Sequence, residues 1–190
     1  MRGMTLAVIA ICLGFVAAPA RADETALATA FGRICLTARG DAAAAIAAAK
    51  AGGWTLDPGL SGKGRAARKG EVDIFQAFTR TAGDESDSLL ILHERNTRPR
   101  RKRPLMECVV SAVPAGDPAA AVAALLGASP VGHDHGAALW MLDDSGAALA
   151  AVQANEVDRA RRLAAADQAV IVRAETQAGR ASISYDGPSR

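Results

Sequence analysis

The stretch Phe31–Trp54, FGRICLTARGDAAAAIAAAKAGGW, decides the fold that this sequence predicts. Around its start, apolar residues recur at helical spacing and form one stripe that a helix must bury. These residues are Leu27, Phe31, Ile34, Cys35 and Ala38. Asp41 is placed to cap a second, Ala-rich helix, and Gly52 and Gly53 are placed to end it. Trp54 then begins an extended segment as a large buried anchor, so the stretch predicts two closely packed helices early in the domain.

The chain after Trp54 is dominated by short strand patterns. In segment 71–80, alternation places Ile74 and Phe78, with Val72, on one face, and Phe75 and Ala77 on the other. In segment 105–113, every second residue is apolar and shares one face: Met106, Cys108, Val110 and Ala112. Turn residues between such runs predict three hairpins. They join 71–80 to 89–92, 137–142 to 147–152, and 170–176 to 181–185.

Two further helices are predicted in the second half of the chain. Asp117 and Pro118 supply a cap and a first-turn proline for one helix, which ends at Gly127. Asn155 is placed to cap the other helix, over residues 156–166.

Together these elements predict an α+β fold, an antiparallel sheet of hairpins covered by the N-terminal helices. The chain has 190 residues, half of them apolar, which suffices for one domain with a substantial core. Strand and helix patterns do not alternate strictly, which argues against a doubly wound parallel sheet. No linker divides the chain, so residues 23–190 are expected to form a single α+β domain.

Residues 1–22 have the pattern of a signal peptide. Arg2 provides a short positive region, residues 4–16 an apolar region, and Ala20-Arg21-Ala22 fits the small-x-small cleavage rule. The apolar run is shorter than the roughly 18 residues that a membrane-spanning helix needs, and no later segment qualifies. We therefore expect a periplasmic or secreted protein without a transmembrane segment in its mature chain. An uncleaved anchor is the alternative.

Removal of the leader changes the cysteine count and the charge. The mature chain keeps Cys35 and Cys108, and its 20 basic residues balance its 20 acidic residues. Because an exported chain meets an oxidising compartment, we predict a disulfide between Cys35 on an early helix and Cys108 on a core-facing strand. The alternative is a pair of buried free thiols.

The strongest local charge signal is the basic segment 95–103, with six positive charges in nine residues. They are Arg95, Arg98, Arg100, Arg101, Lys102 and Arg103. So many charges cannot be buried without partners, so the segment is predicted to be an exposed loop between two strands. It is a candidate site for anionic envelope components such as lipid head groups or saccharides. Nucleic acid is the weakest of these partners, because no aromatic residue is interleaved for base stacking. A solvated loop without a ligand is the alternative.

A second candidate site is His133-Asp134-His135. Two imidazoles on a short loop are suited to zinc or copper, with Asp134, Asp143 or Asp144 as an oxygen ligand. Two histidines do not complete a site, and nothing in the sequence brings His93 near them. An exposed polar loop is the alternative.

Catalysis has little support in the sequence. There is no Gly-x-Ser-x-Gly motif, the histidines have no evident Ser or Asp partner, and Ser61-Gly62-Lys63-Gly64 departs from the phosphate-loop pattern. Asp143 and Asp144 precede Ser145-Gly146 as ordinary turn formers. We expect no catalytic residue and no cofactor. Catalytic groups that assemble only in space are the alternative.

Phe31-x3-Cys35, the Ala-rich helix ending in Gly53-Trp54, and Cys108-Val109 resemble positions in a set of small uncharacterised exported, periplasmic proteins of proteobacteria. The resemblance covers about residues 25–130. It implies export and a disulfide, and it brings no activity, cofactor or catalytic residue. Our leading hypothesis is therefore an exported, disulfide-bonded envelope protein that acts as a non-catalytic binding or accessory module. The alternative is a metal-binding protein or metal-dependent hydrolase centred on His133 and His135.

Overall fold

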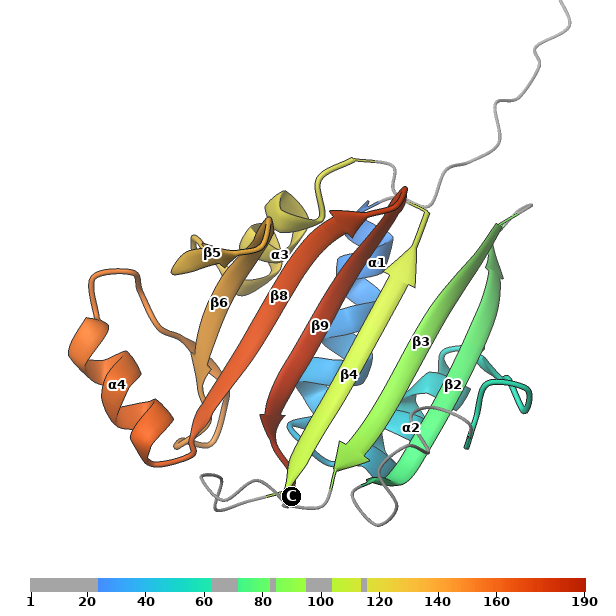
Figure 1. Ribbon diagram of the computed structural model, residues 1–190, viewed down its shortest axis with the longest axis horizontal. Coiled ribbons are helices and arrows are strands. Elements are labelled where there is room, and N and C mark those ends of the chain that lie inside the picture. The colour runs from blue at the N-terminus through green and yellow to red at the C-terminus, as the bar shows by residue number, and fades with distance from the viewer. Residues whose placement is uncertain (1–23, 63–71, 83–84, 95–103, 114–115) are drawn as a thin grey trace, which may run out of the picture.

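A single antiparallel sheet runs through the part of the chain that the computed structural model describes, residues 24–62, 72–82, 85–94, 104–113 and 116–190 (Figure 1). The predicted leader 1–22 and the basic segment 95–103 lie outside these described residues. Among the helices of the described residues, none is long and apolar enough to cross a membrane.

The sheet has nine strands in the order β1-β2-β3-β4-β9-β8-β6-β5, and β7 pairs with β6 outside this row. The strands are β1 (Thr55–Leu56), β2 (Val72–Ala82), β3 (Glu85–Glu94), β4 (Leu105–Ala112), β5 (Gly132–Asp134), β6 (Ala137–Asp143), β7 (Ala150–Ala151), β8 (Ala169–Gln177) and β9 (Arg180–Pro188). All neighbouring strands are antiparallel. The sequence prediction of an α+β fold with an antiparallel sheet is confirmed at this level.

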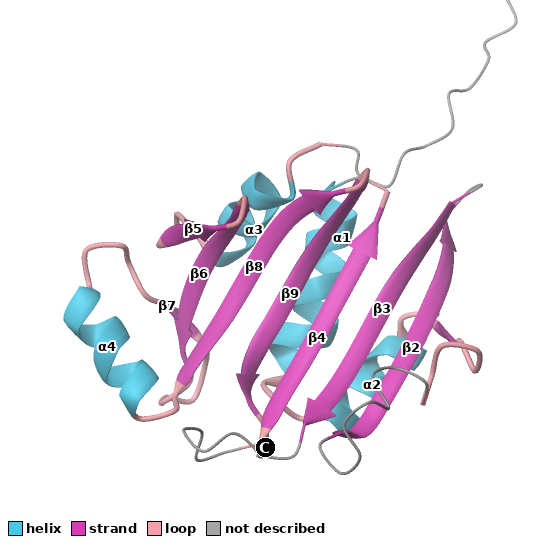
Figure 2. Ribbon diagram, in the orientation of Figure 1, coloured by secondary structure: helices cyan, strands magenta, loops and turns pink. Residues whose placement is uncertain are grey.

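Helices cover one face of the sheet (Figure 2). They are α1 (Glu24–Phe31), which continues as the π-helical turn η1 (Gly32–Leu36), α2 (Ala42–Ala51) and α3 (Pro118–Leu126). A further helix, α4 (Val157–Ala165), lies at the side of β6 and β8. α2 contacts β2 and β3, α1 contacts β4 and β9, and α3 contacts β8 and β9. The predicted cover by the N-terminal helices is thus confirmed for α1 and α2, but the helices of this layer are not all N-terminal, because α3 belongs to it as well. The reason is that a sheet this wide extends beyond α1 and α2, and α3 covers the part nearer its second half.

Local capping explains where the helices begin and end. The Asp41 carboxylate accepts hydrogen bonds from the backbone N–H groups of Ala43 and Ala44, at 2.9 and 3.0 Å. Asp117 caps α3 in the same way, and α3 ends at Gly127, whose φ of 60° a glycine adopts without strain. These predicted caps are confirmed. The predicted cap of α4 is wrong, because Glu156 rather than Asn155 occupies that position.

The core lies between the helices and alternate residues of the strands. One row across the sheet joins Ile91, Cys108, Tyr185, Val172 and Trp140, all nearly or fully buried. From the helical side, α1 adds the fully buried Phe31, and the buried residues of α2 are the small Ala42, Ala45 and Ala49. The alternation predicted for segment 105–113 is confirmed by burial of every second residue of β4.

Two of the three predicted hairpins are confirmed, β2–β3 and β8–β9. The middle one is wrong in most of its length, because β6 pairs with only two residues of β7 and makes its long pairing with β8. The register places Trp140 and Leu142 opposite Val172 and Val170. These apolar cross-strand pairs bury more surface than the Ala-rich segment 147–151 would offer.

Candidate functional site

A disulfide joins Cys35 of η1 to Cys108 of β4, as the sequence predicted. The two Cα atoms are 5.7 Å apart, the residues are separated by 73 positions, and both side chains are fully buried. The bond therefore fastens the helical layer to a central strand in the middle of the core. The alternative of two free thiols is not found.

The residues on both sides of the basic segment 95–103 lie at one end of the sheet. The segment itself is outside the described residues. Its charged residues are Arg95, Arg98, Arg100, Arg101, Lys102 and Arg103. Glu94, the last residue of β3, pairs with Leu105 of β4 and with Val72, the first residue of β2. Segment 63–71, with four more Lys and Arg residues, leads directly into Val72. Two basic segments that are distant in the sequence thus join the sheet at the same end.

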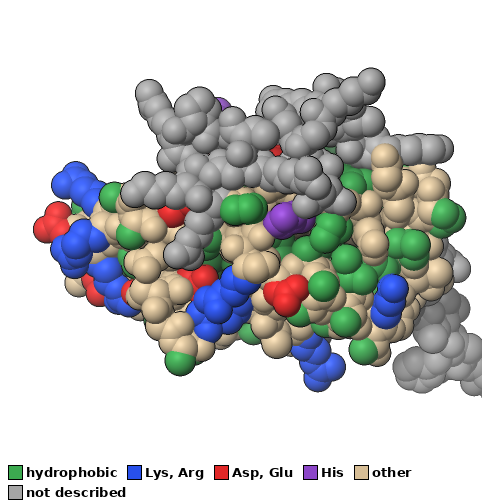
Figure 3. Space-filling model, turned by 90° about the horizontal axis from the view of Figure 1, so that it is seen from below, with side chains coloured by type: hydrophobic (Ala, Val, Ile, Leu, Met, Phe, Trp, Pro, Cys, Tyr) green, Lys and Arg blue, Asp and Glu red, His purple; other side chains and the backbone are tan. Residues whose placement is uncertain are grey.

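Figure 3 views the molecule from this end. Among the side chains coloured by type, Lys and Arg gather mainly on the side of α4, and hydrophobic side chains mainly on the side of β2 and β3. At this end the Nε2 of His93 lies 2.6 Å from the Oγ of Ser189. Sequence reasoning found no serine partner for His93, because the two residues are 96 positions apart. The backbone N–H of Ser189 donates to Pro104 O, so the pair ties the chain after β9 to the ends of β3 and β4.

His133 and His135 lie at β5 and the turn after it, where the sequence suggested only a loop. The His135 side chain is 97% exposed and its Nε2 is 3.5 Å from an Asp134 carboxylate oxygen. Asp134 also lies 3.6 Å from the Arg173 guanidinium. Within the described ranges, no group of three or more His, Cys, Asp or Glu side chains is placed to hold a metal ion.

Asp143 and Asp144 have separate structural roles that the sequence did not reveal. The Asp144 side chain is buried and its Oδ1 accepts hydrogen bonds from Arg39 and Arg190. Arg39 also donates to the backbone oxygens of Gly146 and Ala147. This Arg39–Asp144–Arg190 cluster connects the turn before α2 with the turn after β6 and with the residues after β9. The interpretation of Asp143 and Asp144 as ordinary turn formers is therefore incomplete.

Asp143 instead stabilises its own turn and the start of α4. Its carboxylate accepts from the Ser145 hydroxyl at 2.6 Å, from the Ser145 N–H at 2.8 Å and from Arg159 at 2.9 Å. These hydrogen bonds, those of Ser145 first, lower the pKa of Asp143 to about 2 from 3.8.

The low pKa of Asp143 predicts a loss of stability in acid. The folded state holds this carboxylate ionised at a pH where the unfolded chain takes up a proton, so its contribution is complete above about pH 4 and disappears as the pH falls to about 2. Asp143→Asn is expected to cost about 1 kcal/mol at pH 7, and the cost should shrink towards pH 2. Urea unfolding at several pH values measures this, with the exposed Asp158→Asn as control. A cost independent of pH would contradict the assignment.

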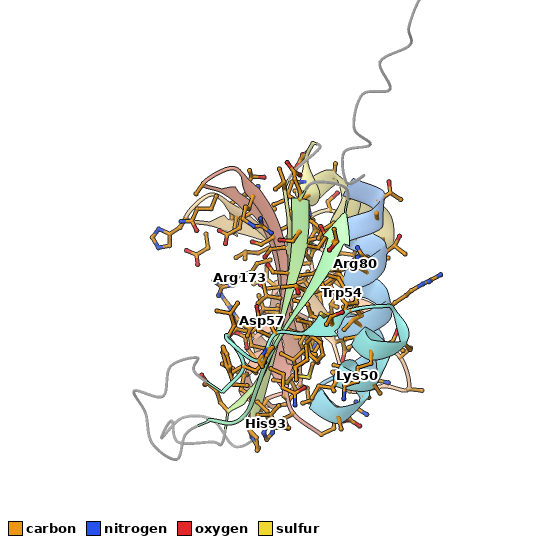
Figure 4. The ribbon with its side chains drawn as sticks, turned by 90° about the vertical axis from the view of Figure 1, so that its right-hand side faces the viewer. Lys50, Trp54, Asp57, Arg80, His93 and Arg173 are labelled. Atoms are coloured by element: carbon orange, nitrogen blue, oxygen red, sulfur yellow. A yellow bond between two sulfur atoms is a disulfide. The ribbon has the colours of Figure 1, made fainter. Side chains whose placement is uncertain are left out.

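A groove of about 650 Å³ lies on the helical side between α1, η1 and α2 and reaches Trp54 and Arg80. The Arg80 guanidinium stacks on the Trp54 ring, 4.6 Å from its centroid. Its Nε and Nη2 donate to one oxygen of Asp87, at 3.2 and 2.7 Å, and the Asp87 side chain is only 6% exposed. Figure 4 shows Trp54 and Arg80 together on this side of the sheet, with Arg173 on the opposite side and His93 at the far end.

A second hollow, of about 430 Å³, lies on the other face of the sheet. Its lining is mostly apolar and includes Leu60, Phe75, Leu90 and Val109. Neither hollow was predicted from the sequence, because each is lined by segments whose proximity depends on the order of strands and helices.

The fold and these sites define an α+β protein whose helical layer is linked by a disulfide to a nine-stranded antiparallel sheet. Comparison with protein-family models, curated proteins and solved structures finds no match.

Proposed function

We propose that this protein is an exported, periplasmic or secreted envelope protein that acts as a non-catalytic binding module for anionic envelope components. The observation that carries the proposal is the pairing of Val72 with Glu94 and of Glu94 with Leu105. This register brings the attachment points of segments 63–71 and 95–103 to one end of the sheet. Ten of the 22 Lys and Arg residues of the chain belong to these two segments.

The charge of the chain outside segments 63–71 and 95–103 supports a role for these two basic segments in binding anions. Outside the two segments, acidic residues outnumber basic ones, and several arginines of the described core are paired with carboxylates: Arg39, Arg80, Arg159 and Arg190. Attraction for a polyanion would therefore be local to this end of the sheet. Each phosphate or carboxylate bound there releases counterions, which favours binding at low salt.

The disulfide supports the location of this function. A buried bond between Cys35 and Cys108 is compatible with folding in an oxidising compartment, where such bonds form and persist. Together with the leader pattern of residues 1–22, it favours export.

The quadruple variant Arg98→Ser, Arg100→Ser, Arg101→Ser and Arg103→Ser is expected to bind anionic surfaces at least tenfold more weakly than the wild type at low salt, because four counterion-releasing contacts are lost. Retention on phosphatidylglycerol vesicles and on heparin measures this for a lipid and a saccharide source. If the wild type is retained on only one of these two materials, that result identifies the anionic component as a lipid or as a saccharide.

The matched control changes exposed arginines elsewhere. Arg161→Ser with Arg162→Ser on α4 should leave retention nearly unchanged. A second variant, with Lys63, Arg65, Arg68 and Lys69 changed to Ser, should weaken retention as the first one does. Equal retention of the wild type and both segment variants would refute the proposal.

A further inference from the structure

The groove beside Trp54 combines an apolar floor with two guanidinium groups. Ile34 and Trp54 line it, together with alanines of α1 and α2 whose short side chains leave the space between the helices open. Arg33 and Arg80 supply the charge, and no residue among its described lining is acidic. Its volume of about 650 Å³ lies within the 300–1,000 Å³ typical of small-molecule sites.

The two arginines differ in how their donors are used. Asp87 engages the Nε and Nη2 of Arg80, and Trp54 supports the guanidinium plane, so this group is held in one orientation and its Nη1 stays available. Arg33 is exposed on η1 and has no ion-pair or hydrogen-bond partner for its side chain among the described residues. The oriented guanidinium of Arg80 and the uncompensated positive charge of Arg33 thus border the same groove.

An ion pair with an almost fully buried carboxylate adds little net stability to a fold, because the cost of desolvating that charge consumes much of the attraction. The Asp87 side chain is nevertheless almost fully buried against Arg80. The pair is therefore better explained by the orientation that it imposes on Arg80 than by stability.

We propose that this groove binds a small organic monoanion, a carboxylate joined to a short apolar chain. Asp87 balances the charge of Arg80, so Arg33 leaves the site with one net positive charge, which a single carboxylate neutralises. The planar guanidinium matches a carboxylate, and the exposed Thr29 hydroxyl at the rim is a further hydrogen-bond donor. The apolar chain would lie over Ile34 and Trp54.

This site is independent of the end of the sheet that carries the proposed polyanion binding. Arg80 pairs with Asp87 close to the β2–β3 turn, whereas Val72 and Glu94 are at the opposite ends of the same strands. Failure of one proposal therefore leaves the other standing, and vesicle retention and groove binding are measured separately.

Calorimetric titration of the purified, oxidised protein with octanoate tests the proposal. We expect saturable binding at one site, with octanol, which lacks the charge, and octyl phosphate, which carries two charges, both binding more weakly. Arg33→Gln should weaken octanoate binding about tenfold, because it removes the uncompensated charge. Ala51→Phe should abolish binding by filling the groove from an exposed helical position.

Matched controls separate these effects from general changes. Arg162→Gln removes an exposed arginine on α4, and Ala47→Phe adds the same ring on an exposed face of α2 outside the groove. Both should bind octanoate as the wild type does, and thermal melting should show that Arg33→Gln and Ala51→Phe stay folded. Absence of saturable binding, equal binding of octanol, tighter binding of octyl phosphate, or equal weakening by the controls would overturn the proposal.

Discussion

Replacing Cys35 and Cys108 together by Ala is expected to lower the free energy of unfolding by about 4 kcal/mol. The disulfide closes a loop of 73 residues, and in the chain-entropy model the loss of that cross-link returns much conformational freedom to the unfolded chain. The fully buried position of both side chains adds a packing cost. A urea titration followed by circular dichroism measures the change.

Reduction of the wild-type protein provides the matched comparison for this variant. The reduced protein should unfold at a urea midpoint well below that of the oxidised protein and slightly above that of the double variant, because it lacks the same cross-link but keeps both buried sulfur atoms. A loss below about 1 kcal/mol in the variant, or a midpoint that reduction does not move, would show that the bond does not stabilise the fold as described.

Asp144→Ala is expected to cost about 2 kcal/mol, a large effect for a residue in a turn. The buried carboxylate receives hydrogen bonds from Arg39 and Arg190, and its loss leaves the mostly buried Arg39 guanidinium without an anion. The expected cost of Asp144→Ala is lower than that for a fully buried pair, because Arg190 is half exposed and screened by water. Thermal unfolding at neutral pH measures it.

The control for Asp144 is Asp158→Ala. Asp158 also faces an arginine, Arg161, but at 3.8 Å and with both side chains exposed, so a change within about 0.5 kcal/mol is expected. If the two variants are equally stable, the Arg39–Asp144–Arg190 cluster does not hold the turns together.

Gly40 belongs to the same structural region and shows how closely the turns approach. Its φ is 84°, and a Cβ atom there would lie 2.1 Å from the backbone oxygen of Pro188. Only glycine therefore fits where the turn before α2 meets the end of β9.

The features that sequence predicted well are those with a local period. Alternation in β4 identified the face that carries Cys108, and the spacing Phe31-x3-Cys35 identified the buried side of the first helical segment. Both cysteines then pointed into one core, and they are the only two cysteines outside the predicted leader 1–22. The disulfide follows from these facts without knowledge of the strand order.

The Arg80–Asp87 pair was also within reach of the sequence. In the β2–β3 hairpin, Ala82 pairs with Glu85, and continuing that register by two residues places Arg80 opposite Asp87. The predicted hairpin pairs 71–80 with 89–92 only, so Asp87 falls in the connection between the two strands and the pair is missed. Its stacking on Trp54 was not predictable, because Trp54 approaches only through the short edge strand β1.

The Arg39–Asp144 contact and the place of α3 depend on topology rather than on local pattern. Arg39 and Asp144 are 105 positions apart in the sequence. They meet because the fold brings the turn before α2 next to the turn after β6. Periodicity shows that a strand has a buried face, but it does not show which strand is its neighbour. The wrong partner for β6 and the limited prediction for the helical layer have this common cause.

β9 is the last strand along the chain, yet it lies between β4 and β8 in the interior of the sheet. Before β9 forms, β4 and β8 each present an unpaired edge, and such edges are templates for association with other chains. During synthesis this vulnerability lasts until residues 180–188 become available. Loss of β9 would therefore separate one sheet into two open pieces, β1-β2-β3-β4 and β8-β6-β5.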